Sequence, residues 1–106
     1  MPTLDLSLRD LEVVRVILQK CVPDHEVWAF GSRVKGTAKP FSDLDLAIVG
    51  DSALPSDVAA DLADAFDESD LPFKVDVVDW ATTSDSFRKI IETDKVQIQS
   101  ASTAGR

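Results

Sequence analysis

Two aspartates separated by one residue open an apolar segment of the sequence, as Asp43 and Asp45 in "SDLDLAIVG". Side chains alternate along a β-strand, so these carboxylates share one face while Leu44 and Leu46 point to the other, toward a core. A second apolar segment, "KVDVVDW", carries Asp76 between two valines in the same way. If the two segments are neighbouring strands whose apolar residues are aligned, the three carboxylates lie together on one face of the sheet.

Carboxylates gathered in this way raise one another's pKa values or need a cation between them. Hard oxygen ligands suit Mg²⁺ or Mn²⁺, which complete their coordination with water and substrate phosphates. Two such ions, about 3.5 to 4 Å apart, can hold the attacking and leaving oxygens of a phosphoryl or nucleotidyl transfer. We expect Asp43 and Asp45 to hold both ions, and Asp76 to hold the one nearer the nucleophile and to accept its proton. The simpler interpretation is that Asp43 and Asp45 form the solvated edge of an acidic protein.

A glycine and a serine, Gly31 and Ser32, end the apolar segment that precedes the two aspartates. Glycine lets the backbone approach a ligand closely with positive φ, and serine offers a hydroxyl. Backbone N–H groups of a helical turn that opens here favour an anion, which indicates a site for the triphosphate of a nucleotide. Arg33 and Lys35 follow and are candidates to neutralise its phosphates. Other roles remain open, with Ser32 as the cap of the turn and the two basic residues on the surface.

Apolar residues at helical spacing and short β-branched runs divide the chain into helices and strands. The helices are expected at 7–22, 56–66 and 85–92, and the main strands at 26–31, 44–49 and 73–80. A short helical turn follows the first strand, and residues 96–99 are expected to add a short strand. Ser7 is expected to cap the first helix, and Asp79 to cap the turn after the third strand rather than to bind metal.

Connection lengths restrict how the strands pair. The connection between the first two strands is interrupted by Gly36 and Pro40 and is too short for the crossover that parallel neighbours need. These strands should be antiparallel, which places Gly31 and Ser32 beside the two aspartates. A whole helix separates the second and third strands, which permits a right-handed parallel crossover and places Asp76 beside Asp45.

These elements predict an α+β fold, a two-layer α/β arrangement in which a small mixed sheet of about three main strands packs with helices. The expected order is helix, strand, short helix, strand, helix, strand, helix. We expect a single domain over residues 1–99 and a flexible tail over residues 100–106.

The composition is that of an ordinary globular protein of 106 residues with a net charge of −8. Excess negative charge repels phosphate backbones, so broad binding of DNA or RNA is not expected, and a basic partner protein suits the chain better. No apolar stretch approaches the roughly 20 residues of a membrane helix, and the amino terminus lacks the pattern of a secretory signal. The single Cys21 cannot form an internal disulfide. These features favour a cytoplasmic protein.

The stretch "GSRVKGTAKPFSDLD" contains Gly-Ser, ten intervening residues and then Asp-x-Asp. It resembles the signature of the nucleotidyltransferase superfamily that includes DNA polymerase beta, kanamycin nucleotidyltransferase and the minimal nucleotidyltransferases of prokaryotes. "KVDVVDW" stands where that family places its third carboxylate, and the expected element order agrees. The length of the chain and the context "VWAFGSRVKG" look most like a minimal nucleotidyltransferase.

The resemblance implies transfer of a nucleoside monophosphate, AMP from ATP being expected, to an acceptor, with pyrophosphate leaving. It implies catalytic metal ligands at Asp43, Asp45 and Asp76, and nucleotide-binding residues at Gly31, Ser32 and Arg33. Minimal members often act as antitoxins that adenylylate a small helical partner of the HEPN type, a toxin ribonuclease. The resemblance therefore implies such a partner for this chain.

Two other functions remain open. One is a non-catalytic subunit that neutralises its partner by contact alone, which the short, acidic chain would favour. Intact carboxylates argue against it, because a site freed from catalysis has no reason to keep three repelling acids. The other is a small-molecule modifier similar to aminoglycoside nucleotidyltransferases, which generally carry further domain or dimer contacts for the acceptor. The sequence identifies neither the acceptor nor the nucleotide base.

Overall fold

The computed structural model of the chain describes residues 3–101. Its helices and strands are α1 (Leu8–Cys21), β1 (Glu26–Phe30), α2 (Ser32–Lys35), β2 (Leu44–Val49), α3 (Ser56–Asp67), β3 (Val75–Asp79), the 3-10 helix η1 (Trp80–Thr82), α4 (Asp85–Thr93) and β4 (Val96–Gln99). The order and the approximate boundaries agree with those expected from the sequence.

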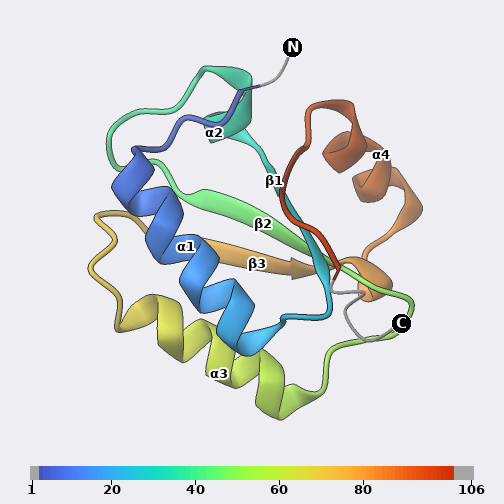
Figure 1. Cartoon of the computed structure of the whole chain (residues 1–106). Helices are drawn as coiled ribbons and strands as arrows, with labels where there is room; N and C mark the ends of the chain where they lie inside the picture. Colours follow the sequence, from blue (N-terminus) through green and yellow to red (C-terminus); the bar gives the residue numbers. More distant parts are fainter. Residues whose placement is uncertain (1–2, 102–106) are drawn as a thin grey trace.

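The strands form one mixed sheet in the order β3-β2-β1-β4 (Figure 1). β1 and β2 are antiparallel, β2 and β3 are parallel, and α3 lies in the crossover between the parallel pair. Both predicted pairings are therefore confirmed. The short strand expected near the C-terminal end is also present, because β4 pairs antiparallel with β1 and extends the sheet from three strands to four.

Capping serines start the helices on either side of the sheet. The Ser7 side chain accepts a hydrogen bond from the Asp10 N–H at 3.0 Å, and the Ser84 side chain accepts one from the Phe87 N–H at 3.3 Å. Each bond satisfies one of the backbone donors that a helix leaves without a partner in its first turn. α1 ends just before Pro23, because the residue preceding a proline is disfavoured in the α conformation.

Alternation along the strands gives the sheet two faces with separate apolar clusters. On one face, Leu44, Leu46 and Ile48 of β2 are buried together with residues of α1 and α3, which lie side by side across the sheet (Figure 1). On the other face, a smaller cluster contains Trp28, Phe30, Ala47 and Ile91. Asp45 and Asp76 lie on this second face, since they alternate with the residues of the first cluster.

The predicted flexible tail falls mostly outside the described residues, because residues 102–106 are not among them. Within its described part, Ser100 Oγ accepts a hydrogen bond from the Gln97 side-chain amide at 2.7 Å. Between residues 3 and 101, none of the helices combines the length and the apolar character needed to cross a lipid bilayer.

Candidate active site

The sheet register brings Asp45 next to both of its predicted neighbours. In the antiparallel pair Asp45 lies opposite Phe30, the last residue of β1, so Gly31 follows at the end of the same strand. In the parallel pair Asp45 lies opposite Asp76 of β3. One position on β2 is thus flanked by the glycine turn on one side and by a second carboxylate on the other.

The carboxyl group of Asp45 is in an unfavourable electrostatic environment. Burial, and then the charges of Asp76 and Asp43, raise the pKa of Asp45 above its ordinary value. Lys74 Nζ lies 3.9 Å from Asp76 Oδ1, but both side chains reach solvent, so this ion pair compensates little of the repulsion. A divalent cation between the carboxylates would offset the repulsion that contributes to this shift.

The carboxylates supply the hard oxygen donors that Mg²⁺ and Mn²⁺ prefer, although they do not converge as fully as the sequence predicted. Asp43 is exposed just before β2, whereas Asp45 and Asp76 are half-buried. Within residues 3–101, no three carboxylate, histidine or cysteine side chains lie close enough to hold a metal ion as a set. Mg²⁺ is usually bound by one or two carboxylates, with water and substrate phosphates as the remaining ligands. The Asp45–Asp76 pair, with Asp43 beside it, fits an ion bound in that way.

Gly31 passes so close to Asp45 that only glycine can occupy this position. Its φ of 84° and ψ of −155° lie in a region that is essentially restricted to glycine. A Cβ on Gly31 would lie 3.2 Å from Cγ of Asp45, and closer still to Oδ2. The backbone conformation therefore requires glycine, and any side chain at this position would also displace the Asp45 carboxyl group.

The helical turn expected after β1 is the one-turn helix α2, and its N-cap is Gly31, which makes no side-chain cap hydrogen bond. The Gly31 carbonyl accepts hydrogen bonds from Val34 N–H at 3.0 Å and Lys35 N–H at 3.1 Å. Ser32 is the first residue of the turn, so its hydroxyl is not the cap. The N–H groups of Ser32 and Arg33 have no acceptor within the helix and remain suited to an anion.

A hollow of about 480 Å³ lies against this part of the sheet. Gly31, Lys35, Asp45 and Asp76 line it with polar groups. Lys35 is exposed, so its ammonium group is free to approach an anionic ligand in the hollow. Four of the predicted residues therefore share one cavity: Gly31, Lys35, Asp45 and Asp76. The other three, Ser32, Arg33 and Asp43, are not part of its lining.

The opposite wall of the hollow comes from α4, which sequence reasoning did not connect with the site. Phe87 and Ile90 line the cavity at a three-residue step that places both on one side of α4, and Asp94, directly after the helix, lines it as well. Phe87 also packs edge-on against Phe30, with ring centroids 5.8 Å apart and an angle of 80° between the planes. Ile90 is 55% exposed, unusual for an apolar residue on a packed helix. The helical spacing was a usable signal, but nothing in the sequence showed which face of the sheet α4 covers.

Arg33 occupies a different environment from the one expected of a phosphate ligand. Only 5% of the residue is exposed, and it is not among the residues that line the hollow. Its guanidinium group donates hydrogen bonds to the backbone carbonyls of Asp5, Pro40 and Ser42, at 2.9, 3.1 and 2.9 Å. The guanidinium group of Arg33 is therefore directed to backbone carbonyls and away from the hollow, so only the backbone N–H of Arg33, in the first turn of α2, remains for a phosphate. The alternative that Arg33 is a surface residue is wrong, because the residue is buried.

Asp79 has the capping role that the sequence indicated. Its side chain accepts hydrogen bonds from the N–H of Ala81 at 3.2 Å, at the start of η1, and from the N–H of Leu54 at 2.8 Å. Its register partner is Ile48, whose side chain belongs to the apolar cluster on the α1 and α3 face. Asp79 is therefore a structural residue outside the acidic pair.

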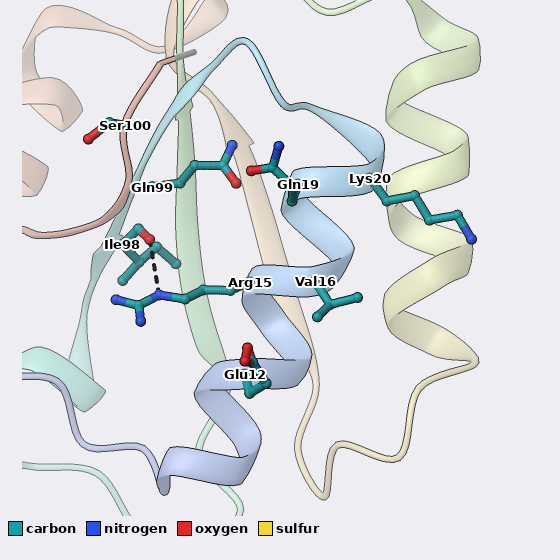
Figure 2. Close-up of a pocket in the computed structure, with 8 residues that line it drawn as sticks. All are labelled: Glu12, Arg15, Val16, Gln19, Lys20, Ile98, Gln99 and Ser100. Carbon is teal, nitrogen blue, oxygen red and sulfur yellow. Dashed lines mark hydrogen bonds between the residues drawn. The ribbon is translucent and has the colours of Figure 1, made fainter. Parts of the chain in front are cut away.

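A second hollow lies between α1 and β4 (Figure 2). Its volume is about 550 Å³, and none of the predicted site residues lines it. Arg15 extends from α1 toward the strand, where its Nε donates a hydrogen bond to the Ile98 carbonyl at 3.3 Å. This hollow is larger than the one beside Asp45, but it is not the better candidate for the active site, because neither the paired carboxylates nor the glycine turn lines it.

Comparisons with known proteins find relatives of similar sequence and fold. A probable protein adenylyltransferase, MntA of Haemophilus influenzae, is 55% identical over 96 residues, which are 91% of this chain and 84% of that protein. A crystal structure of a toxin–antitoxin with AMP-PNP superimposes with a TM-score of 0.72 at 24% identity, covering 89% of this chain and 75% of that chain. The structure of a tri-AMPylated Shewanella oneidensis HEPN toxin in complex with an MNT antitoxin gives a TM-score of 0.60 at 22% identity, over 88% and 71% of the two chains.

Family membership follows from a match that spans nearly the whole chain. The model of the family described as polymerase beta, nucleotidyltransferase matches residues 14–104, which include both strands of the acidic pair and the glycine turn. The two solved structures establish the likeness of the fold. The chain belongs to the polymerase beta nucleotidyltransferase family, and it is a nucleotidyltransferase.

Proposed function

We propose that this nucleotidyltransferase transfers AMP from ATP to a HEPN-type protein partner and thereby acts as its antitoxin. The observation that carries the proposal is the position of Asp45, opposite Asp76 in one strand pair and beside Gly31 in the other. The 55% identical relative is described as a probable protein adenylyltransferase, and a structural neighbour contains a tri-AMPylated HEPN toxin with its antitoxin. Residues 1–99 would act as a single domain, in the cytoplasm, where ATP is available.

Each group of the site has a distinct part in the proposed reaction. The acceptor hydroxyl attacks the α-phosphorus of ATP, its proton passes to Asp76, and the bond from phosphorus to the pyrophosphate oxygen breaks. The first-turn N–H groups of α2 bind the departing phosphates, with Ser32 and Lys35 beside them. Mg²⁺ or Mn²⁺ held by Asp43, Asp45 and Asp76 would neutralise charge on the triphosphate and the attacking oxygen.

Size and charge both bear on the kind of acceptor that the site can serve. The hollow beside Asp45 and Asp76 has a volume of about 480 Å³, within the range of pockets that hold small molecules such as a nucleotide. A net charge of −8 favours association with a basic protein over association with a nucleic acid. A protein acceptor therefore suits this chain better than RNA or DNA.

The direct test is incubation of the purified chain with a purified HEPN-type protein from the same organism, ATP and Mg²⁺. We expect the mass of the partner to increase by one or more AMP groups, and its ribonuclease activity to fall in parallel. An unmodified partner that is still fully inhibited would show that neutralisation occurs by contact alone. Transfer of AMP to an added aminoglycoside but not to the partner would favour the small-molecule alternative.

The apolar wall of α4 gives this proposal a further consequence, because Phe87 offers a ring to the nucleoside of ATP. Base–aromatic stacking contributes about 1–3 kcal/mol, so we expect Phe87→Ala to raise the KM for ATP by about tenfold, with a smaller change in kcat. Steady-state kinetics at varied ATP concentration measure both constants.

Val16→Ala is the matched control for Phe87→Ala. Val16 is also an exposed apolar residue of a helix, but it lies on α1, which packs on the other face of the sheet. We expect its KM for ATP to equal that of the wild type. An unchanged KM in Phe87→Ala, or an equal rise in both variants, would contradict the placement of the nucleoside against α4.

A further inference from the structure

We infer that Arg33 is the positioning residue of this active site, holding the segment that carries Asp43 in place through backbone carbonyl groups. The inference rests on the proposed function, because it treats Asp43 as part of the metal-binding set. It differs from the role expected from the sequence, since Arg33 acts on the protein backbone and not on the phosphates.

The guanidinium group joins three segments that are separate along the chain. Nη1 donates to the Asp5 carbonyl at 2.9 Å, in the segment before α1. Nη2 and Nε donate to the carbonyls of Pro40 and Ser42, at 3.1 and 2.9 Å, in the connection to β2. Its central carbon also lies 4.1 Å from the centre of the Phe73 ring, just before β3. A planar group with donors on several edges is suited to this task, whereas a lysine ammonium is not.

Two of these bonds bear directly on the acidic site. Pro40 and Ser42 belong to a turn closed by hydrogen bonds from Ser42 N–H to the Lys39 carbonyl at 3.0 Å, and from Lys39 N–H to Ser42 Oγ at 2.8 Å. Asp43 is the next residue, and it is exposed, with no strand partner of its own. The position of Asp43 relative to Asp45 therefore depends on the turn, and the turn is held from inside by Arg33.

The bond to Asp5 is reciprocated, which strengthens the anchor. The Asp5 N–H donates to the Arg33 carbonyl at 2.7 Å, while the Asp5 carbonyl accepts from the guanidinium group. Leu4 and Leu6, on either side, pack against the main apolar cluster. The segment before α1 is thus packed on the core, and the Arg33 side chain connects it by hydrogen bonds to the turn at residues 39–42.

The charge of Arg33 is compensated in an unusual way. Among residues 3–101, the ion pairs include none that involves Arg33, although the side chain is almost completely buried. Buried charged groups are normally paired or fully hydrogen-bonded, and here carbonyl oxygens and an aromatic face provide the compensation. A buried arginine satisfied by backbone carbonyls holds those carbonyls at fixed positions, because any displacement leaves a charged donor without a partner.

Arg33→Lys is the first variant that tests this inference, with the isolated chain and the pair Mn²⁺ and AMP-PNP as probes. A lysine keeps the charge and reaches one carbonyl at a time, so the turn loses most of its anchors. Misplacement of a reacting group by about 1 Å can reduce a rate by up to about 100-fold. We expect weaker binding of Mn²⁺ in the presence of AMP-PNP, measured by electron paramagnetic resonance, and a lower kcat for transfer. Hydrogen exchange should become faster for residues 39–43.

Arg15→Lys is the matched control, because Arg15 also donates a hydrogen bond to a backbone carbonyl, that of Ile98. This bond lies beside the hollow between α1 and β4 (Figure 2), away from the acidic site. We expect the Mn²⁺ affinity and kcat of this variant to equal those of the wild type. The Arg33→Ala variant provides a second test, since added guanidinium ions should occupy the space left by the side chain and restore Mn²⁺ binding, whereas sodium chloride should not.

Three outcomes decide between the inference and the function on which it rests. If the wild-type chain binds no Mn²⁺ with AMP-PNP, both fail. If the wild type binds but folded Arg33→Lys binds equally well and exchanges equally slowly over residues 39–43, Arg33 is not a positioning residue and the proposed function stands. A loss of binding in Arg33→Lys that matches only the fraction of unfolded chain, with no rescue of Arg33→Ala by guanidinium, also overturns the inference.

Discussion

Asp45→Asn is expected to abolish AMP transfer and to make the isolated chain more stable at neutral pH. The carboxylate lies between Asp76 and the Gly31 turn, and loss of a group that stabilises charge in the transition state costs at least about 100- to 1,000-fold in rate. Burial and the neighbouring carboxylates raise the pKa of Asp45, so its ionised form opposes folding. An amide of similar size removes that charge. Urea unfolding without divalent ions measures the gain in the free energy of unfolding.

The gain in stability should depend on pH with a definite sign. The folded state binds the Asp45 proton more tightly than the unfolded state, because the pKa is raised. The wild type therefore loses stability relative to Asp45→Asn as the pH rises through that pKa. Below about pH 3.8, the ordinary value for an aspartate, both states are protonated and the difference disappears.

Asp61→Asn, on the exposed side of α3, is the control for this pair of effects, and it should alter neither transfer nor stability. Added Mg²⁺ should stabilise the wild type and leave Asp45→Asn unaffected, because only the folded wild type binds the ion. Full transfer by Asp45→Asn, or a loss of stability at neutral pH, would contradict the assignment of Asp45 as a repelled catalytic carboxylate.

Gly31→Ala is expected to lose both activity and stability, because an added methyl group has no space beside Asp45. The backbone conformation of Gly31 alone would cost about 1–3 kcal/mol for any other residue. The contact of the new Cβ with the Asp45 carboxyl group would then displace either the strand end or the carboxylate. Transfer assays and urea unfolding should therefore both show a large loss.

Gly36→Ala separates the effect of backbone strain from the effect of the contact. Gly36 also has a positive φ, 78°, but a Cβ there would meet no atom within 4 Å. We expect Gly36→Ala to lose about 1–2 kcal/mol of stability, the cost of the left-handed conformation, and to keep its kcat once folded. Equal losses of kcat in the two folded variants would show that the approach of Gly31 to Asp45 has no special importance.

The part of the site that is local in sequence could be predicted with accuracy. Gly31 and Asp45 are joined by a connection too short for a parallel crossover, so antiparallel pairing was the only compact arrangement and the structure has it. Alternation along the strands then assigned the carboxylates to one face and the leucines to the core. The position of Asp76 followed from aligning the apolar residues of two strands, and the register confirms that alignment.

The part that depends on side chains from distant segments could not be predicted. The destination of the Arg33 guanidinium group is set by the carbonyls of Asp5, Pro40 and Ser42, and no periodicity encodes such a contact. The apolar wall made by Phe87 and Ile90 depends on which face of the sheet α4 covers. The incomplete convergence of Asp43 with the acidic pair is also a matter of loop geometry, which strand patterns do not determine.

The mixed pairing of β2 also has a consequence for the order in which the chain can fold. Contacts between β1 and β2 join residues that are near one another along the chain, whereas β2 and β3 meet only after the whole of α3 has been placed. Local pairings close small loops and form early, while distant parallel pairings form late. On this rule we expect the glycine turn and Asp45 to be assembled before Asp76 arrives, and the repulsion between the two carboxylates to arise only when β3 pairs with β2. The acidic pair is therefore complete only when α3 and β3 are both in place.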